Sequence, residues 1–215
     1  MDSFKWELSA AEVFSASALI PVIVINELHS ALPLAEALWA GGIRIMEITL
    51  RSDAALEAIH LLSREMQSML IGAGTVLNAS QLEQAEAAGA AFALSPGSTP
   101  DLLAAGAASS IPLIPGVSNV SDIMLAMDAG YSHFKFFPAA AIGGTAALKS
   151  IYGPLPGAVF CPTGGINETN CLDYLALPNV QCVGGSWIVP EKAVHERDWP
   201  LITALSKKAC AIIKM

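Results

Sequence analysis

The sequence predicts an α/β protein with a single domain over residues 1–215, folded as a short (β/α)8 barrel. Short β-branched apolar runs alternate with alanine- and leucine-rich stretches of helical length along the whole chain. Eight such strand–helix units follow one another at intervals of about 20–25 residues, and this alternation requires a parallel sheet. The predicted strands are nearly continuous apolar runs, as is typical of parallel strands covered by helices.

An open, doubly wound sheet is the alternative architecture for the same alternation. The closed barrel is favoured because no unit is missing and because no GxGxxG motif opens the first crossover. A barrel usually has about 250 residues, so this one is short. No linker, low-complexity segment or shift of composition indicates a second domain.

The first half of the chain supplies four units, preceded by an extra helix at about 7–16. The predicted strands are 19–25, 43–49, 69–75 and 90–96. The helices that follow them are 28–42, 52–66, 78–89 and 99–109. Gly41 and Gly42 end the first of these helices, and Ser52 or Asp53 is the predicted N-cap of the second.

The second half supplies four more units. The predicted strands are 111–116, 132–138, 158–165 and 180–186, and the helices are 118–130, 143–153, 167–177 and 198–213.

Among the histidines, His29 and His60 fall in helices and are expected at the surface. His195 falls in a polar loop, and His133 is interpreted as a core residue in preference to a catalytic one.

The composition excludes several classes of partner. Apolar residues make up 53% of the 215 residues and charged residues 14%, and the formal net charge is −8. The sequence has no run of basic residues that would bind a nucleic acid. No apolar run reaches the roughly 18 residues of a membrane span, and the first residues lack the pattern of a secretory signal, so we expect a cytoplasmic protein.

The four cysteines show neither a CxxC motif nor a cluster with histidine. They are Cys161, Cys171, Cys182 and Cys210. We expect buried, reduced thiols in preference to a disulfide or a metal site. No other spacing indicates metal ligands, so the sequence predicts neither a metal nor another cofactor.

Polar and glycine residues stand at the C-terminal ends of the predicted strands, where barrels of this kind hold their active sites. From the second strand to the eighth they are Glu47, Thr49, Arg51, Gly72, Gly74, Thr75, Ser95, Pro96, Gly97, Pro115, Gly116, Lys135, Thr163, Gly164, Gly165, Gly184, Gly185 and Ser186. Each has a structural explanation when taken alone, as half of an ion pair, as a turn residue or as an ordinary β-former. Their common position at the ends of successive strands favours an active site over separate structural roles.

Lys135 carries the most specific prediction. It stands in the stretch "HFKFFP" on the sixth predicted strand, which has no free edge in a barrel. A strand lysine is more often a solvated edge residue, but alternation places His133, Lys135 and Phe137 together on one face here. Burial disfavours the charged ammonium, and a neutral amine attacks ketones to give Schiff bases.

Three other groups are placed to support carbon-acid chemistry around this lysine. Glu47 is the carboxylate placed to act as the general acid and base. Arg51 offers a bidentate fork to a substrate carboxylate. The glycine-rich ends of the seventh and eighth strands fit a phosphate, which barrels often bind there through backbone N–H groups. These residues are Gly164, Gly165, Gly185 and Ser186.

The chain resembles the class I aldolases that act on 2-dehydro-3-deoxy-phosphogluconate (KDPG) and 4-hydroxy-2-oxoglutarate (KHG). The resemblance covers essentially the whole chain. It rests on the stretches "PVIVI", "GGIRIMEITLRS", "IGAGTVLN", "ALSPG", "PLIPGVS", "FKFFPA", "CPTGGI" and "VGGSW". No position that matters to the family's chemistry departs from its pattern.

The resemblance implies a role for each site residue. Lys135 would form the Schiff base and Glu47 would transfer protons. Arg51 and Thr75 would hold the pyruvyl carboxylate, with Pro96, Phe137 and Thr163 shaping the pocket. Gly164, Gly165, Gly185 and Ser186 would hold the phosphate. The substrate would be a phosphorylated 2-keto-3-deoxy sugar acid, and the assembly a homotrimer.

Three alternatives remain open at this stage. The first is the same chemistry on the epimeric 2-dehydro-3-deoxy-6-phosphogalactonate. The second is a phosphate-binding barrel isomerase or decarboxylase that uses Lys135 only as a charge. The third is a barrel that binds a phosphorylated metabolite without turnover, which gives no reason to bury a lysine.

Overall fold

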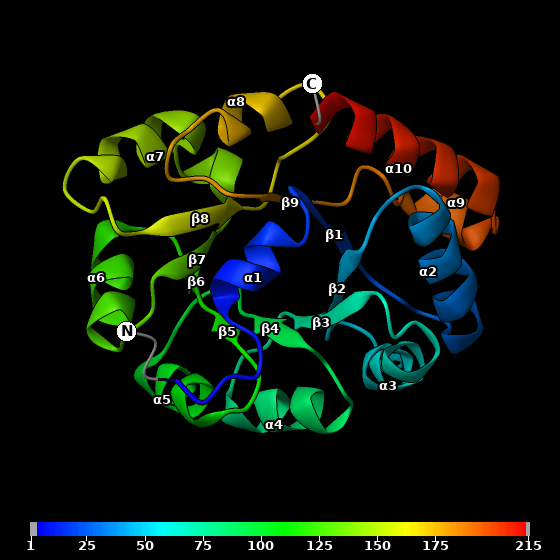
Figure 1. Ribbon diagram of the computed structural model, residues 1–215, viewed down its shortest axis with the longest axis horizontal. Coiled ribbons are helices and arrows are strands. Elements are labelled where there is room, and N and C mark those ends of the chain that lie inside the picture. Colours follow the sequence, from blue (N-terminus) through cyan, green and yellow to red (C-terminus); the bar gives the residue numbers. More distant parts are fainter. Residues whose placement is uncertain (1–3, 214–215) are drawn as a thin grey trace.

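The computed structural model describes residues 4–213, whose strands lie around a common centre with helices on the outside (Figure 1). The strands are β1 (Leu19–Ile23), β2 (Ile45–Thr49), β3 (Leu70–Gly74), β4 (Phe92–Leu94), β5 (Leu113–Ile114), β6 (Gly116–Val117), β7 (His133–Phe136), β8 (Val159–Pro162) and β9 (Val183–Gly185). They form two parallel sheets, ordered β5-β4-β3-β2-β1-β9 and β6-β7-β8. The predicted α/β class with a curled parallel sheet is therefore confirmed.

Two isolated bridges connect the last strands of the two sheets. Phe160 pairs with Val180, and Thr163 pairs with Gly184. Because every pairing between strands is parallel, the carboxyl ends of the strands lie at the same edge. This edge carries the predicted site residues.

The prediction of one continuous fifth strand over residues 111–116 is wrong. The segment divides into β5, which pairs with β4, and β6, which pairs with β7. Pro115 lies between them and has no N–H to donate to a neighbouring strand, so pairing is interrupted there. Each of the other strands is shorter than predicted, by two to four residues.

Helices follow the strands and cover their outer side, except for the first helix, which precedes β1 and lies over the centre (Figure 1). They are α1 (Ala10–Ser15), η1 (Leu28–Ser30), α2 (Ala31–Ala40), α3 (Ala55–Glu65), α4 (Ala79–Ala87), α5 (Pro100–Ala108), α6 (Val120–Asp128), η2 (Ala139–Ile142), α7 (Gly144–Tyr152), α8 (Cys171–Leu175), α9 (Glu191–His195) and α10 (Trp199–Ile213), of which η1 and η2 are 3-10 helices. The extra N-terminal helix is therefore present as α1, and Ser9 and Glu12 form a capping box at its start.

Two local predictions about helices are wrong. Neither Ser52 nor Asp53 caps α3, whose N-cap is Ala54 without a side-chain hydrogen bond. The Ser52 hydroxyl instead donates to the Ile25 carbonyl and connects this loop to the segment that follows β1. His195 is the last residue of α9 and does not lie in a loop; helix α9 is only five residues long, too short for a clear sequence signal.

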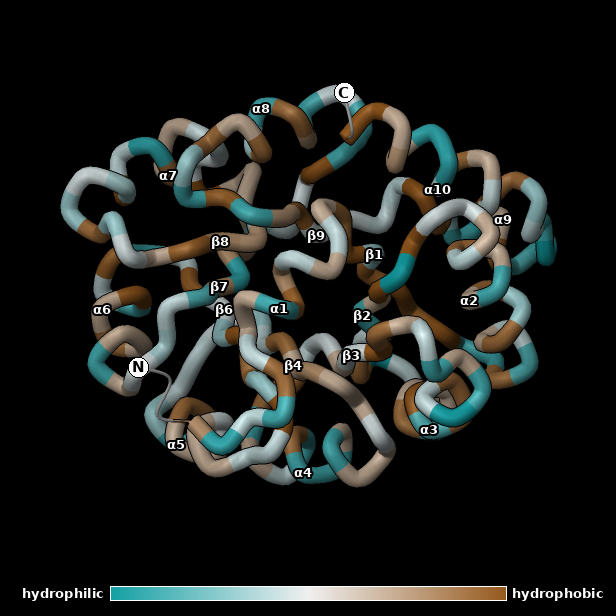
Figure 2. The backbone as a smooth tube through the Cα atoms, in the orientation of Figure 1, coloured by the Kyte–Doolittle hydropathy of each residue, from teal (hydrophilic) through white to brown (hydrophobic). Residues whose placement is uncertain are grey.

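The buried side chains form two clusters. The larger one lies between the strands and the surrounding helices. The smaller one lies inside the ring of strands, and we call it the inner core; it consists of Ala10, Val13, Phe14, Ile20, Ile45, Phe92, Leu94, Ile114, Cys161 and Cys182. Hydrophobic colour accordingly concentrates on the strands and on the helix faces toward them (Figure 2).

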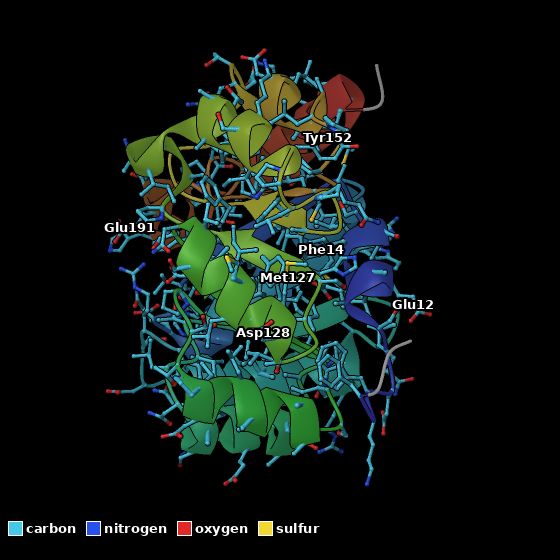
Figure 3. All side chains as sticks on the ribbon, turned by 90° about the vertical axis from the view of Figure 1, so that its left-hand side faces the viewer. Glu12, Phe14, Met127, Asp128, Tyr152 and Glu191 are labelled. Atoms are coloured by element: carbon cyan, nitrogen blue, oxygen red, sulfur yellow. The ribbon has the colours of Figure 1, made fainter. Side chains whose placement is uncertain are left out.

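Helix α1 covers one end of the inner core. Phe14 is 1% exposed and packs edge-on against His133 at 5.3 Å between ring centroids. Figure 3 shows Phe14 directed inward from α1 and Glu191 on the opposite side of the molecule. His133 is half-buried at the start of β7, at this covered end, which agrees with its interpretation as a core residue.

Cys161, Cys171 and Cys182 are buried free thiols, as predicted, and Cys210 is half-buried. Burial raises the pKa of the Cys182 thiol well above its ordinary value, and contact with Cys161 raises it further. The Cys182 thiol thus remains a protonated component of the inner core, beside Cys161. Among residues 4–213, no helix combines the length and hydropathy of a membrane span.

Candidate active site

One buried ion pair marks the centre of the candidate site. Lys135 on β7 donates from Nζ to Oε1 of Glu47 on β2 at 2.8 Å. The two side chains are only 6% and 1% exposed. A charge removed from water in this way is costly unless it is paired with good geometry, so each group depends on the other.

Strand register explains why the two side chains meet across the ring. Glu47 pairs with Gly72 of β3, and Lys135 pairs with Gly116 of β6 and Cys161 of β8. Side chains alternate along a strand, so Phe134 and Phe136 contact the outer cluster while Lys135 faces the interior. The predicted alternation around Lys135 is therefore observed.

Two further predicted residues lie close to the pair. The Phe137 ring centroid is 5.7 Å from Nζ of Lys135, within the range of a cation–π contact. Thr163 is 5% exposed and follows β8 directly, where it pairs with Gly184. Its hydroxyl donates weakly to the Cys161 carbonyl at 3.4 Å. Lys135, Glu47 and Thr163 are thus buried polar side chains of the site, and Thr163 joins it to Cys161 of the inner core.

Pro96 is held by a close backbone contact. A Cβ built on Gly116 would lie 2.3 Å from the Pro96 carbonyl carbon, so only glycine allows β6 to approach this loop. Ser95, which is fully buried, accepts a hydrogen bond from Gly116 N–H through Oγ at 3.1 Å. The loop after β4 is thus fixed against the loop that interrupts the fifth strand.

Arg51 and Ser186 line an open cleft of about 640 Å³ beside this centre. Its lining includes the polar side chains of Asn26, Glu27, Glu191 and His195, none of which was singled out from sequence as a site residue. Arg51 and Ser186 are both exposed. Because Arg51 is exposed while Lys135 and Glu47 are buried, its guanidinium lies at the rim of the site and not beside the buried pair.

The remaining predicted residues follow the strands with unusual backbone angles. Gly164 and Gly165 have φ of 99° and 76°, in the left-handed region that favours glycine. Thr75, directly after β3, has φ of 59°, which is rare for a β-branched residue. Such conformations persist where the surrounding structure enforces them, often at functional sites. Gly185 is buried at the end of β9.

The family model for KDPG and KHG aldolases matches residues 11–205 of the chain. The chain belongs to the KDPG and KHG aldolase family. The resemblance predicted from the sequence motifs is thereby confirmed. Because the match includes both sheets and all strands from β1 to β9, the site described above lies wholly within the family's domain.

Members of this aldolase family match over nearly the whole chain. The 2-dehydro-3-deoxy-phosphogluconate aldolase of Pseudoalteromonas atlantica is 55% identical over 96% of each chain. The KHG/KDPG aldolase of Escherichia coli K12 is 50% identical over 95% of this chain and 96% of its own. A crystal structure of Legionella pneumophila KDPG aldolase, with pyruvate captured as a covalent carbinolamine, is 56% identical with a TM-score of 0.94, and the match covers 95% of this chain and 100% of that chain.

Sequence reasoning missed how the aldolase site is supported. It placed Gly74 and Gly184 at strand ends without giving either a contact. A Cβ on Gly184 would lie 2.2 Å from Oγ1 of Thr163, and one on Gly74 would lie 2.0 Å from Oε1 of Glu47. Glycine at the end of a predicted strand is the only signal for such close approaches.

Proposed function

We propose that the chain is a class I aldolase that cleaves 2-dehydro-3-deoxy-6-phospho-D-gluconate to pyruvate and D-glyceraldehyde 3-phosphate. We further propose that it cleaves 4-hydroxy-2-oxoglutarate to pyruvate and glyoxylate. The observation that carries the proposal is the buried Lys135–Glu47 pair at 2.8 Å. A lysine held away from water beside a carboxylate suits Schiff-base chemistry, and the relatives named above are aldolases.

The first step requires an uncharged lysine. Glu47 accepts the hydrogen bond from Nζ, so it is in position to take the ammonium proton and leave a free amine. The amine of Lys135 attacks the C2 ketone of the substrate to give a carbinolamine. The protonated Glu47 returns this proton to the departing hydroxyl, so that loss of water produces an iminium and restores the Glu47 carboxylate. The captured carbinolamine in the Legionella relative supports this order of events.

The iminium is the electron sink for carbon–carbon cleavage. Glu47, acting directly or through a water, removes the proton of the C4 hydroxyl. The C3–C4 bond breaks, its electron pair moves into the C2–N system as an enamine, and the aldehyde leaves. Glu47 gives the proton that it took from the C4 hydroxyl to C3 of the enamine, which restores the iminium and the carboxylate. Water then hydrolyses the iminium to pyruvate and the Lys135 ammonium, which pairs again with Glu47.

Residues around the pair would recognise the two ends of the substrate. We assign the pyruvyl carboxylate to Arg51 and Thr75, because a guanidinium binds carboxylates bidentately. Pro96, Phe137 and Thr163 would shape the pocket around the reacting carbons. The phosphate would bind at Gly164, Gly165, Gly185 and Ser186. Left-handed angles at consecutive glycines, as at Gly164 and Gly165, suit a backbone N–H nest for an anion.

We also infer the larger architecture and setting. The two sheets would together form one (β/α)8 barrel, with β5 and β6 counted as one strand; the bridges between β8 and β9 and the pairing of β1 with β9 support closure. The aldolase would act in the cytoplasm as a homotrimer. Light scattering of the purified protein, which should give three times the mass of one chain, tests the assembly.

A product assay tests the proposed function. The purified protein would be incubated with the phosphogluconate substrate, its phosphogalactonate epimer and 4-hydroxy-2-oxoglutarate in parallel. Pyruvate would be measured by lactate dehydrogenase, and the aldehydes by their own coupled assays. We expect equal amounts of pyruvate and glyceraldehyde 3-phosphate, and faster turnover of the gluconate than of the epimer. Faster turnover of the epimer would identify the phosphogalactonate as the preferred substrate. If none of the three compounds gave pyruvate, the proposal would be overturned.

A further inference from the structure

We infer that Gly74 is a positioning residue for the aldolase chemistry: its missing side chain leaves the space in which the Glu47 carboxylate reaches Lys135. This inference rests on the proposed function for its catalytic part. Its structural part, the dependence of Glu47 on a glycine at position 74, stands on geometry alone.

The geometry is specific to one oxygen atom. A Cβ built on Gly74 would lie 2.0 Å from Oε1 of Glu47, 2.5 Å from its Cγ and 2.6 Å from its Cδ. The same Oε1 accepts the hydrogen bond from Nζ of Lys135. A methyl group at position 74 would therefore occupy the place from which the carboxylate contacts the lysine.

The register of β2 and β3 brings this contact about. Glu47 is paired with Gly72, and Gly74 is two residues further along β3 on the same face. The Glu47 side chain therefore lies along β3 toward its carboxyl end, over Gly74. Any side chain at position 74 would force the carboxylate away from the strand.

The backbone gives no other reason for glycine at this position. Gly74 is not among the glycines with positive φ, and it is the last residue of a regular strand. An alanine would fit these extended angles without strain. All three of the nearest atoms to the added Cβ belong to Glu47, so the exclusion of a side chain comes from that residue.

Gly72 offers a matched control on the same face of the same strand. A Cβ there would meet the Phe92 ring at 2.3 Å, in the inner core. Gly72→Ala therefore overpacks β3 without entering the space of Glu47. Both variants should lower stability, and only Gly74→Ala should act on proton transfer.

The first experiment measures chemistry in Gly74→Ala. We expect kcat for cleavage to fall about 100-fold, because a displacement of about 1 Å can cost this much. Exchange of the pyruvate methyl protons with deuterated solvent should slow by a similar factor, since it needs the same acid and base. Borohydride should still trap pyruvate on the protein. A Gly74→Ala protein with wild-type kcat and exchange rate would overturn the inference.

The second experiment remains decisive if Gly74→Ala fails to fold. Glu47→Ala removes all three atoms that the new methyl group would meet. We expect Gly74→Ala to lower the melting temperature in the wild-type background and not in the Glu47→Ala background, whereas Gly72→Ala should lower it in both. An equal loss from Gly74→Ala in both backgrounds would show that Glu47 is not the reason for the glycine.

The two experiments separate this inference from the proposed function. If wild-type protein forms no adduct with pyruvate, the aldolase proposal fails while the melting comparison still reports on the Gly74–Glu47 contact. If the wild type reacts and the melting losses in the two backgrounds are equal, the inference about Gly74 fails and the aldolase proposal stands.

Discussion

At the scale of single residues, the buried pair of Lys135 and Glu47 explains why either side chain is tolerated inside the protein. Removing one partner of a buried pair leaves an uncompensated charge and typically costs about 3–5 kcal/mol of stability. Replacements that test a catalytic role should therefore keep the charge or the shape of the residue that they change. Two such replacements separate the nucleophile from the general base.

Lys135→Arg keeps a cation beside Glu47 and removes the nucleophile, because a guanidinium does not lose its proton in proteins. We expect cleavage to be abolished while the circular dichroism spectrum and cooperative unfolding remain those of a folded protein. Appreciable turnover by folded Lys135→Arg protein would contradict the claim that Lys135 forms a Schiff base with the substrate.

Glu47→Gln keeps the size of the side chain and removes the acid and base. We expect cleavage to slow by roughly 10²–10⁴-fold, the usual contribution of a positioned proton-transfer group. Borohydride with pyruvate should still label Lys135 after longer incubation. Unchanged steady-state turnover of Glu47→Gln would exclude this residue from the mechanism.

At the scale of elements, most connections between helices and strands are made by side chains that the repeating pattern does not specify. Glu86 near the end of α4 is an example. Its carboxylate accepts hydrogen bonds from the hydroxyls of Ser110 at 2.6 Å and Ser109 at 2.8 Å, in the loop between α5 and β5. These bonds, that of Ser110 foremost, lower the pKa of Glu86.

The lowered pKa of Glu86 predicts a pH-dependent contribution to stability. A carboxyl group whose pKa is lower in the folded state than in the unfolded state stabilises the protein at pH values above its unfolded-state pKa, which is about 4.3. This contribution is lost as the pH falls through the folded-state pKa. Glu86→Gln should therefore reduce the free energy of unfolding by about 1 kcal/mol at pH 7, and the difference should shrink as the pH falls below about 4.3.

Urea unfolding at several pH values measures this difference. Glu83→Gln is the matched control, because Glu83 is an exposed carboxylate on the same helix. The Glu83 variant should stay close to wild type at each pH. A deficit of Glu86→Gln that is as large at pH 3 as at pH 7 would show that the charge of Glu86 does not support the loop.

The elements also show how far sequence patterns reach. Alternating apolar runs specified the parallel strands and the helices after them, because burial on both faces leaves a strong compositional signal. The break at Pro115 and the missing side-chain cap of α3 were not foreseen. The break follows from a local feature, because Pro115 has no N–H to donate to a neighbouring strand. The missing cap depends instead on a partner distant in sequence, the Ile25 carbonyl that engages Ser52. Local propensity carries no information about such partners.

At the scale of the whole molecule, the candidate residues were found from sequence because parallel strands end at one edge. This rule brought Lys135 and Glu47 to the same region although 88 positions separate them. The rule does not give the direction of a side chain. The direct contact between the two charges, the position of Arg51 at the rim and the space over Gly74 required the structure.

The central claim of the account is that Lys135 is a nucleophile and not only a charge. Borohydride reduction in the presence of pyruvate, read by intact mass and peptide mapping, tests it most directly. We predict one pyruvate-sized adduct per chain, located on Lys135 and absent without borohydride. A folded protein that gives no adduct, or gives one only on exposed lysines, would contradict the claim and favour a barrel that binds its phosphorylated ligand without a covalent step.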